Sequence, residues 1–184
     1  TGTELTGFNL ASNATTVATV SGVTITVVNN KSTSTKSATI TVSKSGYTSA
    51  TIALSQSAGA KVYNTPVIST YTYDKRDAAG GTLTPNLAYS QVWTWNGVAN
   101  SGATISGSTS SPATGVTIAA TIPTPVTGAS VAAATGIVTW AANQGTERSV
   151  TVSLTITMNG KTSAAKTATA TQLADAIDHY GDMV

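Results

Sequence analysis

Residues 149–159 read SVTVSLTITMN, an unbroken alternation of polar and apolar side chains. Successive side chains of a strand point to opposite faces, so a period of two is typical of a half-buried β-strand. The apolar positions are Val150, Val152, Leu154, Ile156 and Met158. We therefore expect these five side chains to lie in a core and the hydroxyl-bearing residues between them to face water.

This stretch belongs to a block that occurs twice, at residues 30–56 and 143–172. Each copy contains, in order, an asparagine turn, a basic residue followed by serine, an alternating strand, a glycine turn, an alternating strand and a glutamine. This order predicts a hairpin that ends a β-module, present once in each of two modules. The residues expected to point inward in the first copy are Ala38, Ile40, Val42, Ala50, Ile52 and Leu54.

The remaining strand signals are short segments rich in β-branched or aromatic residues, bounded by Gly, Pro, Asn or Ser. They fall at Val17–Val20, Val23–Val28, Pro66–Tyr73, Leu87–Trp95, Val116–Ile122 and Ile137–Trp140. Because no helical period separates them, the sequence predicts an all-β fold of tandem immunoglobulin-like antiparallel β-sandwich modules. We expect a short or incomplete module at residues 1–60, a second module at 61–175, and a tail or linker at 176–184.

Composition narrows the classes of function. Charged residues make up 9% of the chain, against roughly 25% in ordinary soluble domains, so hydroxyl groups must cover much of the surface. The basic residues are scattered, with no cluster beyond Lys75-Arg76, which argues against a nucleic-acid partner. The chain contains no cysteine, which excludes disulfide and thiol chemistry. No apolar run is long enough for a membrane span.

The repeated block, with its basic residue plus serine and its terminal Thr-Gln or Ser-Gln, resembles the C-terminal half of bacterial immunoglobulin-like modules. It is most similar to the BACON-type domains of Bacteroidetes and their phages. The segment Thr135-Gly136-Ile137-Val138-Thr139 is similar to the Thr-Gly-X-Val-Thr segment of the broader bacterial Ig-like group. The first copy carries Lys36 where the family usually has arginine. The resemblance implies a non-catalytic sandwich, often in tandem arrays, that spaces other domains or binds surface glycans.

Catalytic chemistry finds little support in the sequence. Ser-His-Asp catalysis needs a base held in place by a third group, and the only histidine is His179 near the chain end. Asp175, Asp178, His179 and Asp182 are spaced for one helical face and could gather a metal if the tail coiled, but Gly181 interrupts the stretch and favours a flexible tail or linker. We expect no catalytic residue, no metal site and no cofactor.

Aromatic residues are the candidates for ligand binding. Trp93 and Trp95 share one face of an expected strand, and the Asn96-Gly97 pair that follows them is a hairpin-turn signal. Tyr71 and Tyr73 share a face of another strand. Core packing is the ordinary role of such residues. An exposed pair could instead form a platform for sugar rings.

Two functions follow as hypotheses. The first is a structural or adhesive module displayed on a phage virion or a bacterial cell surface, in contact with neighbouring structural subunits or a surface glycan. The second is a carbohydrate-binding module of a secreted or lipid-anchored protein. Both place the chain outside the cell, and low charge at exposed strand edges favours a homo-oligomer or lattice. The first residue, Thr1, suggests a fragment of a longer array.

Overall fold

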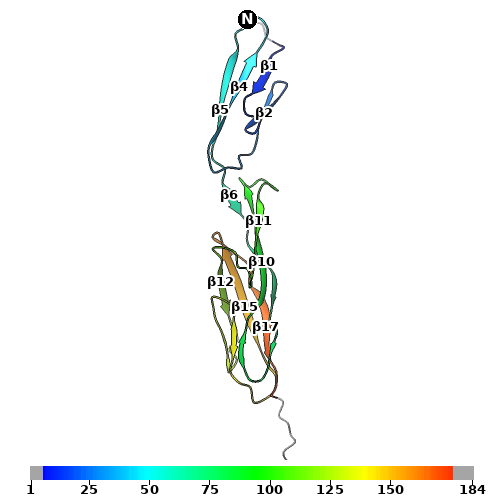
Figure 1. Ribbon diagram of the computed structural model, residues 1–184, viewed down its shortest axis with the longest axis vertical. Helices are drawn as coiled ribbons and strands as arrows, with labels where there is room; N and C mark the ends of the chain where they lie inside the picture. Colours follow the sequence, from blue (N-terminus) through cyan, green and yellow to red (C-terminus); the bar gives the residue numbers. More distant parts are fainter. Residues whose placement is uncertain (1–5, 176–184) are drawn as a thin grey trace, which may run out of the picture. The chain divides into compact units, whose positions relative to one another are not determined.

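The computed structural model describes residues 6–175, in which β-strands form immunoglobulin-like sandwich modules (Figure 1). The chain divides into two compact units. The first contains the residues up to Val62 and also Trp93–Ala103, and the second contains Tyr63–Val92 and the residues from Thr104 onward. The boundary expected after residue 60 lies two residues from Val62. The sequence did not predict that Trp93–Ala103 groups with the first unit, and the tail expected at 176–184 lies outside the described residues.

The second unit is built on two main sheets and one small sheet. Its strands are β6 (Lys61–Tyr63), β7 (Val67–Thr72), β8 (Lys75–Arg76), β9 (Gly81–Leu83), β10 (Asn86–Trp95), β11 (Ala103–Ser108), β12 (Thr117–Thr121), β13 (Ala129–Val131), β14 (Val138–Trp140), β15 (Arg148–Met158), β16 (Lys161–Thr162) and β17 (Lys166–Gln172). Three of these strands are shared with the first unit, which contains Lys61 and Val62 of β6, Trp93–Trp95 of β10 and Ala103 of β11. One main sheet has the order β11-β10-β6, with β7 also paired to β10, and the other has the order β12-β15-β17-β8. The small sheet has the order β13-β14-β9. The pairing of β8 with β17 is parallel.

The core of the second unit confirms the alternation in residues 149–159. All five expected side chains of β15 are at most 2% exposed. They pack against residues of the facing sheet that include Ile68, Tyr71, Leu87 and Tyr89. The sandwich thus buries one face of each main sheet, as its sequence period requires.

The first unit is smaller. Its strands are β1 (Asn9–Ser12), β2 (Ala18–Ser21), β3 (Thr24–Val27), β4 (Lys36–Ser43) and β5 (Ala50–Gln56). They form a sheet of order β1-β4-β5 and a β2-β3 hairpin. Four residues are buried in its core, namely Val17, Ala18, Ala38 and Ile40.

The inward-facing prediction for β5 is partly wrong. Ile52 lies directly opposite the buried Ile40, on the same face of the sheet, yet it is 43% exposed. Ala50 is also exposed, and Leu54 is partly buried. The period assigned the face correctly, but no second main sheet covers that face among the described residues of the first unit.

The repeated block closes each unit with the same hydrogen bonds. In the second unit the buried Asn143 donates to the carbonyl oxygens of Thr146 and Leu173, at 2.8 and 2.9 Å, and accepts from the amide of Gly145 at 3.2 Å. In the first unit the buried Asn30 makes the same three bonds. Its partners are Ser34, Ser57 and Ser32, at 2.9, 2.8 and 3.0 Å.

The closing glutamines are equivalent as well. Gln172 donates to the carbonyl of Ala141 at 2.9 Å, and Gln56 donates to that of Val28 at 2.7 Å. In each unit the acceptor carbonyl belongs to the residue two positions before the buried asparagine, Asn143 or Asn30. We call these residues the closing network: Asn30, Lys36 and Gln56 in the first unit, and Asn143, Arg148 and Gln172 in the second. The network ties the last strand of each unit to the turn before its partner strand.

Candidate functional site

The tryptophan pair lies at the tip of the β10–β11 hairpin, outside both hydrophobic cores. Along β10, Leu87, Tyr89 and Gln91 are buried, whereas Trp93 and Trp95 are only partly buried. All five occupy the same phase of the strand. The core therefore ends within β10, and the two tryptophans extend past it.

Gln91 marks the end of this core. Its amide donates to the carbonyl oxygens of Asn64 and Met158, at 2.8 and 3.1 Å, and its oxygen accepts from Asn159 at 2.9 Å. Met158 is the last residue of β15, which faces β10 across the sandwich. Beyond this point the side chains of β10 no longer belong to that core, and Trp93 and Trp95 are partly buried.

The geometry of the pair decides what it could bind. The two indole rings meet edge to face, with centroids 5.4 Å apart and planes inclined by 82°. The Nζ atom of Lys61 lies 4.4 Å from the ring centroid of Trp93, in a cation–π contact. Perpendicular rings do not form one flat platform, and Lys61 occupies one face of Trp93. The pair can offer a sugar a single ring face and a cation.

The hairpin tip is held by hydrogen bonds within the first unit. Asn96 donates to the side-chain oxygen of Asn29 at 2.6 Å and accepts from the amide of Ala60 at 2.7 Å. Asn29 in turn donates to the carbonyl of Trp95 at 3.3 Å. The expected Asn96-Gly97 turn is present, with φ angles of 54° and 74°. These bonds fix the backbone that carries the tryptophans.

Of the two roles that the sequence leaves open for Tyr71, its burial favours core packing. Its ring is 4% exposed and belongs to the core of the second unit. Tyr73 is partly buried, and the two rings meet edge to face at 5.5 Å. Tyr71 lies in the core cluster and Tyr73 packs against it. Aromatic spacing alone does not distinguish a buried face of a strand from an exposed one.

The two tyrosine hydroxyls form a chain that ends on the backbone. Tyr73 donates to the carbonyl of Gly136 at 2.5 Å, so the Tyr71 hydroxyl is the donor in the 2.8 Å bond between them. Burial raises the pKa of Tyr71, and the bond to Tyr73 raises it further. Burial also raises the pKa of Tyr73, while the bond from Tyr71 opposes that rise. These two hydrogen bonds anchor the end of β7 to the Thr135-Gly136 turn, and they use the hydroxyl protons of both tyrosines.

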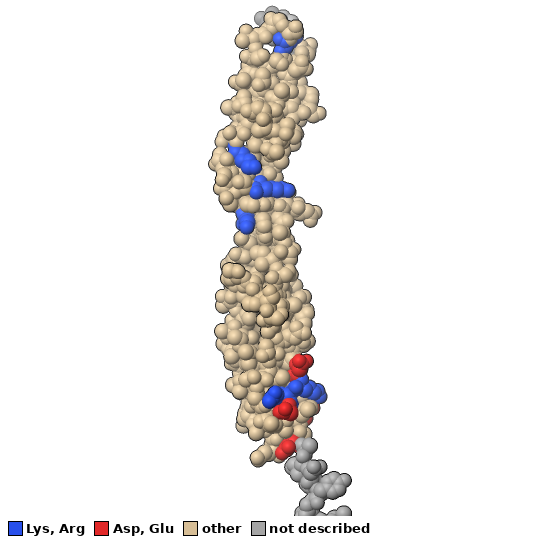
Figure 2. Space-filling view, in the orientation of Figure 1, with Lys and Arg blue, Asp and Glu red and all other residues tan. Residues whose placement is uncertain are grey.

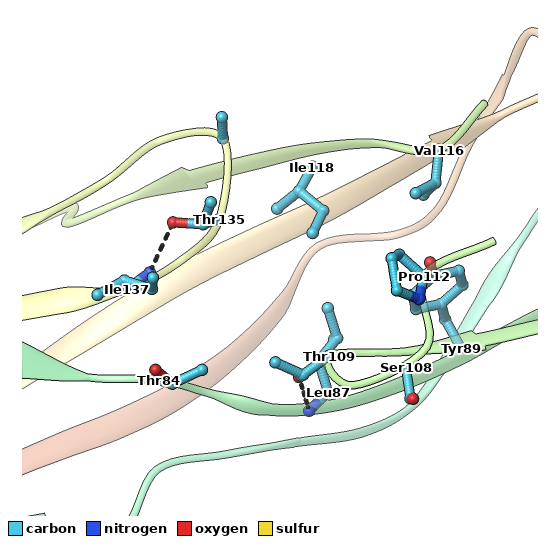
Figure 3. A pocket seen from close by; sticks show the side chains of 11 residues that line it. Thr84, Leu87, Tyr89, Ser108, Thr109, Pro112, Val116, Ile118, Thr135 and Ile137 are labelled. Carbon is cyan, nitrogen blue, oxygen red and sulfur yellow. Dashed lines mark hydrogen bonds between the residues drawn. The ribbon is translucent and has the colours of Figure 1, made fainter. Parts of the chain in front are cut away.

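A cavity of about 460 Å³ opens between the sheets of the second unit, and the sequence did not predict it. Its lining residues are Thr84, Leu87, Tyr89, Ser108, Thr109, Pro112, Val116, Ile118, Ala134, Thr135 and Ile137. In Figure 3, Val116 and Ile118 face Leu87 and Pro112 across the opening. Thr109 is engaged internally, because it donates to the carbonyl of Pro85 and accepts from the amide of Leu87, at 2.6 and 2.9 Å. The walls thus offer mainly apolar contact.

Charged groups are few, and two ion pairs lie among the described residues. Lys75 pairs with Glu147 at 3.2 Å, and Arg76 pairs with Asp77 at 3.6 Å. On the face shown in Figure 2, acidic and basic side chains occupy small areas separated by wide uncharged surface. Within residues 6–175, no group of three or more His, Cys, Asp and Glu residues is placed to hold a metal ion. Asp178, His179 and Asp182 lie outside the described residues.

The described part of the chain has no helix long and apolar enough to cross a membrane. No family model and no curated protein matches the chain. Among solved structures it is similar to "Protocadherin gammaB7 EC3-6 cis-dimer structure", at 12% sequence identity and a TM-score of 0.39. The match covers 91% of this chain and 40% of that one, so the chain spans two fifths of the length of that protein.

Proposed function

We propose that the chain is a non-catalytic pair of Ig-like modules, displayed on a phage virion or a bacterial cell surface, that spaces other domains or attaches to a surface. The observation that carries the proposal is the closing network. Its hydrogen bonds recur in both units and are all made within the protein. What the two copies share is therefore the means of making a rigid module, which is the requirement of a spacer.

The surface supports the same role. Threonine and serine occupy outward positions of β15, β16 and β17, as in Ser149–Thr171 and Thr157–Thr162, whose hydroxyls bond at 3.0 and 2.9 Å. An uncharged, hydroxyl-rich surface suits contact with neutral glycans or with neighbouring structural subunits. The sequence also resembles BACON-type and other bacterial Ig-like modules, and we include membership of that group in the proposal.

Surface display can be tested with antibodies raised against residues 1–184. We expect gold-labelled antibody to bind intact virions or unbroken cells that make this chain. Labelling that appears only after the cells are permeabilised, and never on particles, would overturn the proposal.

The alternative is a carbohydrate-binding module, and the partial exposure of Trp93 and Trp95 favours it. Affinity electrophoresis in gels that contain neutral polysaccharides separates the two functions. If the alternative holds, a polysaccharide retards the chain, and Trp93→Ala abolishes the retardation without lowering the melting temperature. Tyr47→Ala is the matched control, because Tyr47 is 58% exposed on another turn of the first unit. Loss of binding in both variants would exclude the tryptophan pair as the specific site.

A further inference from the structure

The cavity of the second unit lies between its two main sheets, on the side where β11 and β12 are the last strands of their sheets. Leu87 and Tyr89 reach it from β10, Ile118 from β12, and Pro112 from the loop that joins β11 to β12. Its volume of about 460 Å³ falls in the range of about 300–1,000 Å³ that is typical of small-molecule sites. Both sheets that form its walls are present, so the cavity is a property of the whole second sandwich.

One wall of the cavity is held in place by contacts between β10 and the loop after β11. The Thr109 amide donates to the carbonyl of Leu87 at 3.0 Å, and the Tyr89 hydroxyl accepts from the amide of Ala113 at 3.1 Å. A Cβ atom at Gly107 would lie 2.5 Å from the Tyr89 side chain, so glycine allows the ring to lie against β11. These contacts make the wall part of the fold, and preformed walls are usual in small-molecule sites.

The residues that line the cavity are all uncharged. Aliphatic side chains predominate, and Figure 3 shows Val116 and Ile118 on one side of the opening and Leu87 on the other. A charged ligand would lose its hydration here and gain no opposite charge in return. The cavity therefore suits a neutral molecule whose surface is mainly apolar.

A hydrogen-bond donor in the wall adds one polar feature. The Tyr89 side chain is 2% exposed and lines the cavity. Its hydroxyl oxygen accepts from Ala113, and no acceptor among residues 6–175 takes its proton. A phenolic hydroxyl both donates and accepts, and a buried hydroxyl gains from a partner for its proton. The ligand that fits this wall carries one hydrogen-bond acceptor.

We propose that this cavity binds a neutral small molecule with an aliphatic chain and one hydrogen-bond acceptor, of the class of fatty alcohols and esters. The chain packs between Ile118 and Leu87, and the acceptor receives the Tyr89 hydroxyl proton. The second unit is then a carrier of an apolar ligand as well as a structural module. This role rests on the cavity alone and does not depend on where the chain is displayed.

The test uses the full chain and 1-octanol as the probe. Chemical-shift titration by NMR measures the affinity, and nuclear Overhauser effects from octanol protons to protein methyl groups locate the bound molecule. We expect saturable binding of one molecule, with Overhauser effects to Leu87, Val116 and Ile118. Octanoate and octylammonium are charged at neutral pH and should bind about tenfold or more weakly than octanol.

Two neighbouring alanines give a matched pair of variants. Ala133 and Ala134 are both exposed in the turn between β13 and β14, and Ala134 lines the cavity whereas Ala133 does not. Ala134→Phe should place its ring in the opening and weaken octanol binding by about tenfold or more. Ala133→Phe should leave the affinity within about twofold. The melting temperature of each variant shows whether the sandwich is intact.

Several outcomes would overturn the proposal. Binding that does not saturate would mean that octanol only partitions onto apolar surface, and Overhauser effects confined to the exposed Val67 or Val98 would place it outside the cavity. Equal weakening by Ala133→Phe and Ala134→Phe would also exclude the cavity as the site. Equal affinity for octanol and octanoate would exclude a site for neutral ligands. If Ala134→Phe unfolds the second unit, the Overhauser effects in the unmodified chain decide the question by themselves.

Discussion

The two closing networks differ at one residue, and the difference shows how much a single side chain can hold. In the second unit, Arg148 donates to the Gln172 oxygen at 2.8 Å and to the carbonyls of Thr127 and Ala141, at 3.0 and 2.7 Å. In the first unit, Lys36 occupies the same register position opposite Gln56. The buried Gln56 oxygen has no hydrogen-bond partner.

Arginine and lysine are not interchangeable here, because a guanidinium presents five donors in a fixed plane and an ammonium is a single mobile point. The Arg148 guanidinium also lies 5.2 Å from the ring centroid of Trp140. The second unit thus has a satisfied network over a large core, and the first has an unsatisfied one over a small core. We expect the first unit to be the less stable of the two.

The largest effect should come from Arg148→Ala, which removes the donor for Gln172, Thr127 and Ala141 together. Leaving several polar groups unpaired should lower the free energy of unfolding of the second unit by about 3 kcal/mol. Arg148→Lys, which copies the first unit, should cost about half as much. Both losses of stability can be measured by denaturant unfolding, with amide hydrogen exchange in β15 and β17 as the probe. If Arg148→Lys left the stability of the second unit unchanged, a single ammonium would serve as well as the guanidinium, and the planar fork would be unimportant.

A smaller effect should follow from Gly59→Ala. The Gly59 amide donates to the Ser32 carbonyl at 2.7 Å, and a Cβ atom there would lie 2.1 Å from the Asn30 carbonyl oxygen. The backbone must shift, so we expect a loss of about 2 kcal/mol in the first unit. In the second unit Asp175 makes the equivalent bond to Gly145 at 3.2 Å and already carries a Cβ. Asp175→Ala is the matched control and should change stability by less than about 0.5 kcal/mol.

Alkaline pH should change the stability of the two units differently, because the first unit has no counterpart of the Tyr71–Tyr73 pair among its described residues. A raised pKa in the folded state means that the stabilisation is complete below the unfolded value of about 10 and is lost as the pH rises above it. For Tyr71 the loss approaches about 1.4 kcal/mol per pH unit. Tyr71→Phe should flatten the pH dependence of β15 and β17 exchange between about pH 10 and 12, after correction for intrinsic exchange. If Tyr71→Phe left this pH dependence unchanged, the loss of stability at alkaline pH would not come from Tyr71.

Sequence reasoning predicted the parts of this fold that depend on period and order. The apolar face of residues 149–159, the two closing hairpins and the Asn96-Gly97 turn follow from spacing and turn chemistry. Spacing and turn chemistry do not predict how far the facing sheet extends. Trp93 and Trp95 share the phase of Tyr89 and Gln91, yet the core ends at Gln91, where β15 ends at Met158.

The sequence did not predict the closing network, for a different reason. Asn30 and Asn143 are recognisable as turn residues, but their bonds reach Ser57 and Leu173, far along the chain. Contacts of that kind depend on the assembled hairpin. The cavity beside Leu87 likewise depends on how far two sheets diverge, which no local pattern records.

The smallest and most informative change is Lys36→Arg, which gives the first unit the residue that the second already has. A guanidinium at this position should donate to the unpaired Gln56 oxygen and stabilise the first unit by about 1 kcal/mol. The gain should vanish in a Gln56→Ala background, because the acceptor is then absent, so a double-mutant cycle isolates the bond. Hydrogen exchange in β4 and β5 is the readout. If Lys36→Arg stabilises the unit equally with and without Gln56, the gain comes from arginine's packing, and the two units differ for a reason other than the bond between the guanidinium and the glutamine.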